Sequence, residues 1–558
     1  VSKGLSSVNN GAESITGQIN MEYRKPTDEK PLFLNASVMN DTKTDFNIAS
    51  SLQMGEKWST VLLGHVSGNF RTFDHNHDGF MDDPEMFQFN VANRWLYYGP
   101  TGVQVRFGLR ALQDMRKGGQ SGYDHKKYTL SSTSPWGSDI VNRQLNTYVK
   151  VGVPISADNA KNIAFVADYT LTDMNLRAGA SKYLATQNSG FFNVLFQDEI
   201  NDFHKFTLAL GGTADWFSED FMRKVAAQKL DPGKTAKAFY NAGVSGEYTF
   251  HAGEKFSSIL GFRGDWFNGE GFKAVPRVTL KYSPLEQIVL RANGGRGLRR
   301  ALPVIDNIGV LSTGKAFTGA YSDHLLEDAW TFGGNATFYL PFGASDDTYL
   351  SFDYFGTRFA EQMVVDYEHG LNAIDFYALG GKRSYSNNYQ VDFNVEAFRR
   401  FTVSATFRYT DAKVELEGRG LVERPMTSRY KGVLNLQYAT NLNKWIFDFT
   451  ASVNGKSRVY EFMKGLRGDD GELLYKDGYT PVYPLLYLQV TKRFKGVDLY
   501  LGAENLTNFR QKNVVIGTAI EGMSGHVDAS RPDFDASAVW GPIMGTKFYL
   551  GARFTLWK

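Results

Sequence analysis

An acidic run at residues 74–85, DHNHDGFMDDPE, has the residue types and spacing of a calcium-binding loop. Asp74, Asn76 and Asp78 alternate along it, Gly79 stands where a sharp turn is needed, and an acidic residue comes last, as in an EF-hand loop. Because Ca²⁺ takes about six to eight oxygen ligands, alternate carboxylates in a tight turn suit this ion. We expect the ligands to be Asp74, Asn76, Asp78, the Phe80 carbonyl, Asp82 and Glu85.

The last position of this loop admits an alternative. Pro84 stiffens the approach of Glu85, so Asp83 is the other residue that fits the closing position. His75 and His77 have the spacing of ligands for a softer metal, and a solvated acidic hairpin is the alternative without any ion. We expect a structural Ca²⁺ of modest affinity, about 10⁻⁴ to 10⁻³ M. The flanks are β-like, which excludes signalling by the opening of a helix pair.

The segments that must position this loop alternate between apolar and polar residues, as β-strands do. In KWIFDFTASVNG at 444–455, Trp445, Phe447 and Phe449 share one face and Asp448 and Thr450 the other. The same period runs through FTVSATFRYT at 401–410 and TKFYLGARFTLWK at 546–558. One apolar and one polar face per strand suits a soluble sandwich or a membrane barrel with a wet lumen.

Connection lengths favour the barrel. From a first strand near 32–39, short connections at 55–57, 98–102, 251–255, 283–287, 441–444 and 495–497 alternate with long polar ones near 69–85, 113–141, 217–238, 299–329, 457–481 and 509–545. Short turns at one end and long loops at the other are typical of outer-membrane barrels. We therefore expect an all-β chain that forms a transmembrane antiparallel β-barrel of about 22 strands, with an unusually long pair near 347–368 and 373–398. The acidic run, between the third and fourth strands, lies at the long-loop end.

Composition excludes several classes of function. The 558 residues carry a net charge of +2 with charges well mixed, which argues against a nucleic-acid surface. There is no cysteine, and no H-E-x-x-H, G-x-S-x-G or Walker motif. GGRGLRR at 294–300 closes a strand rather than opening a helix, which speaks against a dinucleotide site. We expect no enzymatic activity.

Both ends of the chain resemble TonB-dependent outer-membrane receptors. VSKGLSSVNNGAESITGQINMEYRKP is similar to the closing segment of that family's plug domain, and VDLYLGAENLTNF to its penultimate barrel strand. GGRGLRRALPVIDNIGVL and QMVVDYE resemble segments of Bacteroidetes receptors. The matching plug positions are Val1, Gly4, Ser7, Gly11, Gly17, Ile19 and Asn20. The resemblance implies that 1–26 is the C-terminal end of a plug, that 27–558 is the barrel, and that the rest of the plug lies upstream.

The resemblance also implies a function. Such receptors actively import a scarce nutrient across the outer membrane of a Gram-negative bacterium, using the inner-membrane TonB complex. We expect a bulky metal chelate, either a cobalamin-type corrinoid or a ferric siderophore, with outer-membrane lipid and a surface lipoprotein as further partners. An importer of glycan, peptide or haem is the alternative within the class, and a non-transporting surface receptor or adhesin barrel the alternative outside it. Candidate ligand-binding residues on the long loops are Arg299, Arg300, Tyr321, His324, Arg510 and Arg531.

Overall fold

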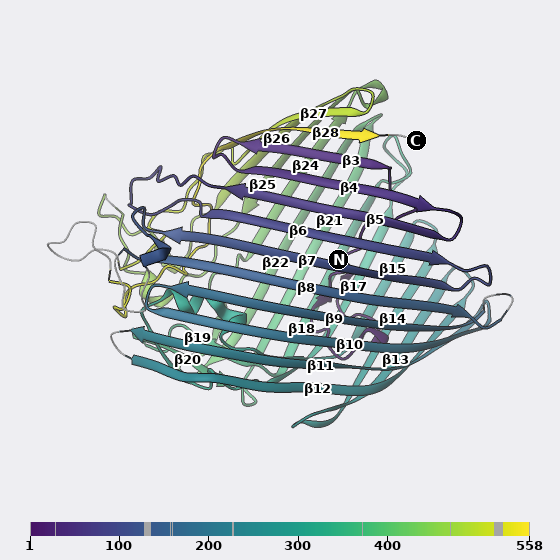
Figure 1. Ribbon diagram of the computed structural model, residues 1–558, viewed down its shortest axis with the longest axis horizontal. Coiled ribbons are helices and arrows are strands. Elements are labelled where there is room, and N and C mark those ends of the chain that lie inside the picture. The colour runs from purple at the N-terminus through teal and green to yellow at the C-terminus, as the bar shows by residue number, and fades with distance from the viewer. Residues whose placement is uncertain are drawn as a thin grey trace.

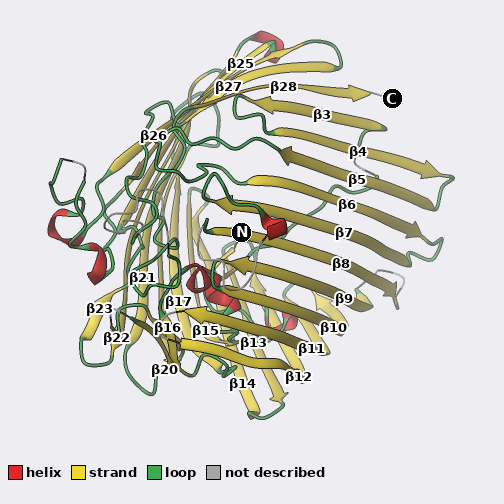
Figure 2. Cartoon of the chain, turned by 60° about the vertical axis from the view of Figure 1, so that its left-hand side comes forward, coloured by secondary structure: helices red, strands yellow, loops and turns green. Residues whose placement is uncertain are grey.

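The computed structural model describes residues 2–27, 29–127, 135–156, 158, 160–225, 228–370, 372–468, 470–517 and 528–556. Its main body is one closed antiparallel barrel (Figure 1). The strands tilt across the barrel, and the N-terminal residues lie within it (Figure 2). None of the described helices has the length and apolar character needed to cross a membrane.

Twenty-two strands make the wall, each paired with its neighbour in the chain, and the barrel closes where Leu556 of the last strand pairs with Leu32 of the first. The first half comprises β3 (Leu32–Met39), β4 (Thr44–Met54), β5 (Trp58–Asn69), β6 (Glu85–Tyr98), β7 (Gln104–Gly119), β8 (Gly137–Pro154), β9 (Lys161–Ala178), β10 (Ser181–Asn201), β11 (His204–Val225), β12 (Gln228–Ala252) and β13 (Phe256–Phe267). The second half comprises β14 (Gly271–Leu285), β15 (Ile288–Arg300), β17 (Leu326–Tyr339), β18 (Tyr349–Glu361), β21 (Ser384–Phe398), β22 (Phe401–Leu416), β24 (Tyr430–Ala439), β25 (Trp445–Asn454), β26 (Tyr483–Arg493), β27 (Val497–Glu504) and β28 (Lys547–Leu556). The sequence prediction of about 22 strands is confirmed.

Smaller elements lie inside the barrel or in its loops. β1 (Ser2–Lys3) pairs with β2 (Gly17–Gln18), and β16 (Ala316–Gly319), β20 (Ala373–Ala378) and β19 (Met363–Asp366) form a three-stranded sheet of their own. β23 (Gly420–Glu423) pairs with the end of β22. The short 3₁₀ helices are η1 (Val8–Asn10), η2 (His125–Lys127), η3 (Ile305–Ser312), η4 (Asn441–Asn443), η5 (Glu461–Met463) and η6 (Lys476–Gly478).

Alternation separates an apolar outer surface from a polar lumen, as the sequence predicted. On β28, Phe548 and Leu550 are exposed on the outside, whereas the Tyr549 hydroxyl between them donates to Gln489 Oε1 at 3.0 Å. Aromatic rings gather on the outer surface beside the short turns, where Trp58 packs on Tyr97 with ring centroids 4.8 Å apart. Rings at this level are typical of the interfacial girdle of a membrane barrel.

Two expectations about strand length are wrong. The segment 217–238 is no long polar loop, because β11 runs to Val225 and β12 begins at Gln228. Its inner face carries Phe217 and Phe221, which belong to an apolar cluster with Phe317 of the 301–325 connection, and this packing supports strands where polar composition suggested a loop. The pair expected near 347–368 and 373–398 is interrupted, because β19 and β20 leave the wall to join β16.

The long connections pack together into what we call the loop lid: the described residues of 70–84, 120–136, 301–325, 362–383, 455–482 and 505–546. One apolar cluster joins Phe80, Trp136 and Phe534 from three of these connections. Another joins Val459, Met463 and Tyr475 to Ile516 and Ala538. The lid therefore has small apolar cores of its own that bridge connections far apart in the sequence.

Candidate ligand and metal sites

The acidic loop connects β5 and β6 at the long-loop end, as its strand parity predicted. The Asp74 carboxylate accepts hydrogen bonds from the backbone N–H groups of Asp78 at 3.2 Å and Gly79 at 3.0 Å. The Asn76 side chain accepts a hydrogen bond from the backbone N–H of Asp78 and donates one to the Asp78 carboxylate. Gly79 has a φ of 83°, the left-handed conformation that a glycine adopts without strain. The first half of the loop is therefore already wound into a tight turn around its carboxylates.

The charges in this turn repel one another. Burial raises the pKa of Asp78, and the nearby charges of Asp74 and Asp82 raise it further, whereas hydrogen bonds from the Phe80 N–H and from Asn76 act in the opposite direction. A divalent cation would relieve this repulsion, and the oxygen-only donor set fits a hard cation such as Ca²⁺. Within the described part of the chain, however, no three His, Asp or Glu side chains converge closely enough to form a metal-binding group.

The second half of the loop faces other partners. The Asp82 side chain is 1% exposed and accepts hydrogen bonds from the backbone N–H of His75 at 2.8 Å and from its ring Nδ1 at 2.9 Å. Glu85 is the first residue of β6 and forms an ion pair of 3.5 Å with Lys117 directly across the ladder. Asp83 forms an ion pair of 3.1 Å with Lys547. The structure thus brings Asp74, Asn76 and Asp78 together and directs Asp82 and Glu85 elsewhere.

The acidic loop is bound at two points, to other lid connections through Phe80 and to the barrel wall through Asp83. The Phe80 ring lies 6.3 Å from Trp136, which lies 5.4 Å from Phe534. Lys547 Nζ binds Asp83 and also Asp41 at 3.0 Å, a carboxylate that is 1% exposed. The turn is therefore packed against Trp136 and Phe534 of two lid connections and is joined through Asp83 to the first residue of β28.

Inside the barrel, residues 2–26, which we call the tail, are bound to the wall. The guanidinium of Arg277 on β14 donates to the backbone carbonyls of Ser6 and Ser7, both at 3.0 Å, and of Ala12 at 2.9 Å. Asn193 on β10 donates to the Asn9 carbonyl at 2.7 Å. Hydrogen bonds to main-chain carbonyls hold the tail by its backbone, so they tolerate variation of the tail side chains.

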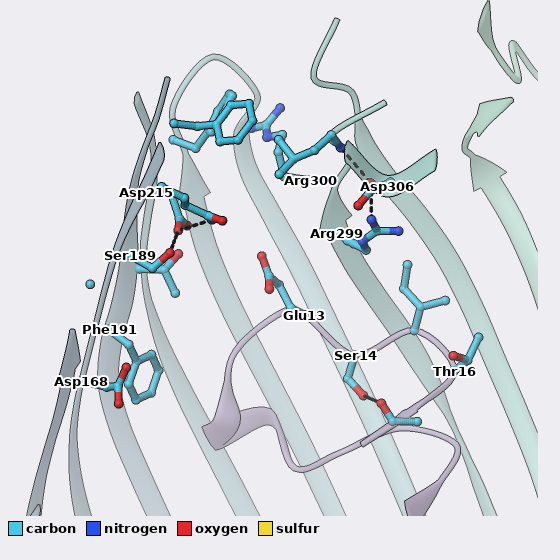
Figure 3. A pocket seen from close by; sticks show the side chains of 18 residues that line it. Glu13, Ser14, Thr16, Asp168, Ser189, Phe191, Asp215, Arg299, Arg300 and Asp306 are labelled. Carbon is cyan, nitrogen blue, oxygen red and sulfur yellow. Dashed lines mark hydrogen bonds and ion pairs between the residues drawn. The ribbon is translucent and has the colours of Figure 1, made fainter. Parts of the chain in front are cut away.

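A cavity of about 550 Å³ lies between the tail and the wall of β9 to β12, under the 301–325 connection. Figure 3 shows the Glu13 carboxylate pointing from the tail into this space, with Asp215 and Ser189 on one side and Arg299 and Asp306 on the other. Burial raises the pKa of Glu13, and the neighbouring charge of Asp215 adds to the effect. The cavity also contains the aromatic rings of Phe191, Phe217 and Phe239.

Arg299 and Arg300 both line this cavity, as their loop position suggested, but both are already paired. Arg299 forms ion pairs with Asp306 and, at 3.3 Å, with Glu327. Arg300 pairs with Glu270 at 2.9 Å and donates to the His324 carbonyl at the same distance. With both arginines paired and Glu13 and Asp215 facing inward, the cavity has no surplus of positive charge.

The other four candidates lie outside the cavity lining. His324 packs between the Phe217 and Phe239 rings, and burial, with Lys237 and Arg300 nearby, lowers its pKa to about 4. Tyr321 packs against Phe317 and Phe376 in the lid. On the 505–546 connection, Arg531 pairs with Asp533, and the backbone of Gly545 packs closely against Arg510.

Sequence reasoning missed Arg223, which is fully buried at the lid-side end of β11. Its guanidinium donates to Ser181 Oγ and to the carbonyls of Thr313 and Lys315, each at 2.6 Å, and stacks over the Phe317 ring at 4.5 Å. A lone arginine in a β-like segment gives no sequence signal, because its partners lie 42 to 92 residues away.

Comparison with solved structures places the fold. The ferric-catecholate import receptor Fiu from E. coli K12 aligns with a TM-score of 0.68 at 12% identity over 99% of this chain and 85% of that one. The siderophore receptor PirA from Acinetobacter baumannii aligns with a TM-score of 0.69 at 12% identity, covering 99% and 84%. P. aeruginosa FpvA bound to pyoverdines aligns with a TM-score of 0.69 at 11% identity, covering 99% and 75%.

No protein-family model matches the sequence. No curated protein matches it either. At about 12% identity, the structural likeness establishes a shared barrel fold.

Proposed function

We propose that this chain is the barrel of a TonB-dependent receptor in the outer membrane of a Gram-negative bacterium of Bacteroidetes type, and that it imports a metal chelate. The observation that supports this most directly is the closed 22-strand barrel with a polar lumen, a bound tail and a packed lid over one end. Import and siderophore receptors have the same fold over almost the whole chain. A barrel of this size is too wide to be filled by its own wall side chains, which suits passage of a bulky ligand.

The role we propose involves no covalent chemistry on the ligand. Residues of the lid would contact the chelate first, and the lumen wall would contact it after the TonB complex has moved the plug. Two of the three solved structures described above are named as receptors, and the third is described in complex with pyoverdines and iron, which supports a role in binding and import rather than in catalysis. A ferric siderophore is favoured over a corrinoid because each of the three is named for a siderophore, a ferric catecholate or a pyoverdine.

We further propose that the acidic loop holds a structural Ca²⁺ at the mouth of the barrel, with Asp74, Asn76, Asp78 and the Phe80 carbonyl as ligands. Asp82, and either Glu85 or Asp83, would have to leave their present partners to complete the set. The ion would stabilise the turn that Phe80 connects to Trp136 and Phe534, and so hold the lid in place. A surface lipoprotein that docks on the lid is a further proposed partner.

The deciding experiment expresses the full-length precursor in a bacterial host that lacks its own siderophore and cobalamin receptors. Uptake of ⁵⁵Fe as a tris-catecholate or a trihydroxamate complex, and of labelled cyanocobalamin, is measured with and without a functional TonB protein. TonB-dependent uptake of any of these supports the proposal. Binding without uptake would favour the non-transporting receptor. If no chelate bound, an importer of glycan, peptide or haem would become the favoured function.

A further inference from the structure

Four basic side chains line one stretch of the lumen wall near the short-turn end. They are Arg94 on β6, Arg106 and Arg110 on β7, and Lys150 on β8, and we call them the basic track. The ladder register places them on the lumen side, because Arg106 pairs with both Leu96 and Lys150, and Arg110 pairs with the buried Ala92. Their neighbours along the strands, such as Phe107, are exposed on the outer surface.

The track borders two cavities. One, of about 570 Å³, is lined by all four basic residues. The other, of about 230 Å³, also includes Arg94 and Arg106 and lies closer to the short turns. The larger one shares Asp168 and Phe191 with the cavity under the 301–325 connection. Three adjoining cavities therefore run along the wall from the lid side to the short-turn end.

The charges of the track are held in place without being neutralised. Arg94 donates to the Tyr148 hydroxyl at 2.9 Å and to the Arg24 carbonyl at 2.8 Å, and Arg110 donates to the Tyr23 hydroxyl at 2.7 Å. Among the described residues, no carboxylate lies within ion-pair distance of any of the four. The buried Nε of Arg110 has no hydrogen-bond partner there.

The nearest acid does not offset this charge. Asp168 is the one carboxylate in the lining of the larger cavity, and it already accepts hydrogen bonds from Asn146 at 2.9 Å and Thr170 at 3.2 Å. Four like charges on one wall of the lumen repel each other, and the low-dielectric walls of the cavities they line concentrate their field. Such an arrangement is stable when an anion accompanies it, and planar guanidinium groups favour oxygen anions with several acceptor atoms.

We propose that the basic track is a binding site for a polyanionic ligand on its way through the lumen. This inference rests on the proposed import function and narrows its substrate class to chelates that carry several negative charges, such as a ferric tris-catecholate trianion. An overall neutral corrinoid would gain nothing from the track. The hydroxyls of Tyr148 and Tyr23 add neutral donors at the same wall.

The test uses the purified chain in detergent and the trianionic dye 8-hydroxypyrene-1,3,6-trisulfonate as probe, with binding followed by fluorescence anisotropy. The double variant Arg94→Gln/Arg110→Gln should bind the probe about tenfold more weakly at low salt, since two charge-assisted contacts are lost. Raising the salt to about 0.5 M should weaken wild-type binding in the same direction. The charge-conserving double variant Arg94→Lys/Arg110→Lys should bind the probe more tightly than the Gln double variant and more weakly than wild type, because it keeps the charge and loses the planar donors, which separates charge from a structural role.

Two single variants on β8 form a matched pair, because one removes a charge from the lumen face and the other removes a charge from the outer face. Lys150→Gln should weaken binding, whereas Arg143→Gln, on the outer side and paired with Asp173, should leave it unchanged. Equal affinity of the Arg94→Gln/Arg110→Gln variant and wild type, or an equal loss in Arg143→Gln, would overturn the proposal. In cells, uptake of cyanocobalamin in preference to the ferric trianion would overturn the substrate class while leaving import intact. Absence of all chelate uptake would instead count against the proposed function.

Discussion

Arg223→Met should release the 301–325 connection from the wall while leaving the barrel intact. The substitution keeps most of the side-chain volume and removes the donors that hold the Thr313 and Lys315 carbonyls. Each buried acceptor left without a partner costs about 1–3 kcal/mol, so two of them weaken the local structure by about 2–6 kcal/mol. Because 1.4 kcal/mol corresponds to about a factor of ten, amides that exchange through local opening should exchange at least about 30-fold faster.

Hydrogen exchange followed by mass spectrometry measures the local opening of the 301–325 connection directly. The amides of Gly314 and Ala316, which donate to Phe534 and Asn372, report on the released segment, and those of the β11–β12 ladder report on the barrel. Lys224→Met, an exposed neighbour on the same strand, is the control and should change neither set. Unchanged protection at Gly314 and Ala316 would refute the assignment, and equal acceleration of the ladder would show that Arg223 supports the barrel rather than the connection.

Three further predictions concern the loop and the lid. Asp74→Asn and Asp78→Asn should each abolish the gain in thermal stability that about 1 mM CaCl₂ gives over EDTA, measured by differential scanning fluorimetry, and a wild type insensitive to EDTA would contradict the site. The pKa of His324 is lowered to about 4, so the unfolded chain takes up a proton at a higher pH than the folded chain does. The free energy of unfolding should therefore fall, by less than about 3 kcal/mol, as the pH drops from about 6.5 to 4. His324→Gln should flatten this dependence when unfolding is measured across that pH range, and an unchanged slope would exclude His324 as its source. Lys547→Met leaves the buried Asp41 and the Asp83 carboxylate unpaired and should lower stability by about 3 kcal/mol in urea unfolding, whereas Lys495→Met, in a short turn, should have no effect.

The fold could be predicted from the sequence because every strand of a barrel follows the same local pattern of alternating residues and connections. A period of two places one face of each strand in the lumen, and alternating connection lengths fix which end carries the loops. Both signals are local in sequence, so they locate the acidic loop between β5 and β6 correctly. They fail at 217–238, where Phe217 and Phe221 pack against the 301–325 connection and no neighbouring residue in the sequence reports that contact.

Only the part of the candidate calcium site that depends on contacts close in the sequence was predictable. The turn made by Asp74, Asn76 and Asp78 depends on contacts within five residues, and the sequence pattern encodes it. The ion pair of Glu85 depends on ladder register with Lys117, which a loop pattern cannot report. Likewise, Arg299 reaches the cavity as its position suggested, but its pairing with Asp306 and Glu327 is a property of the packed lid.

The two sides of the lumen differ in whether their basic side chains are paired with carboxylates. On the wall that binds residues 6–14 of the tail, Arg263–Asp265 and Arg296–Asp328 form bidentate pairs, and the Arg277 guanidinium is taken up by tail carbonyls. The tail approaches this wall so closely that a Cβ at Gly297 would lie 2.0 Å from the Ser14 carbonyl oxygen. A neutralised, tightly packed wall suits a permanent contact, because moving it would expose paired charges and tear apart fitted surfaces. On the wall of β6 to β8, the basic track lines open cavities without matching carboxylates. A ligand that must enter and leave needs charge that is not already paired, so the proposed transit fits the wall of β6 to β8, which touches the tail only where Arg94 donates to the Arg24 carbonyl and Arg110 to the Tyr23 hydroxyl among the hydrogen bonds described above.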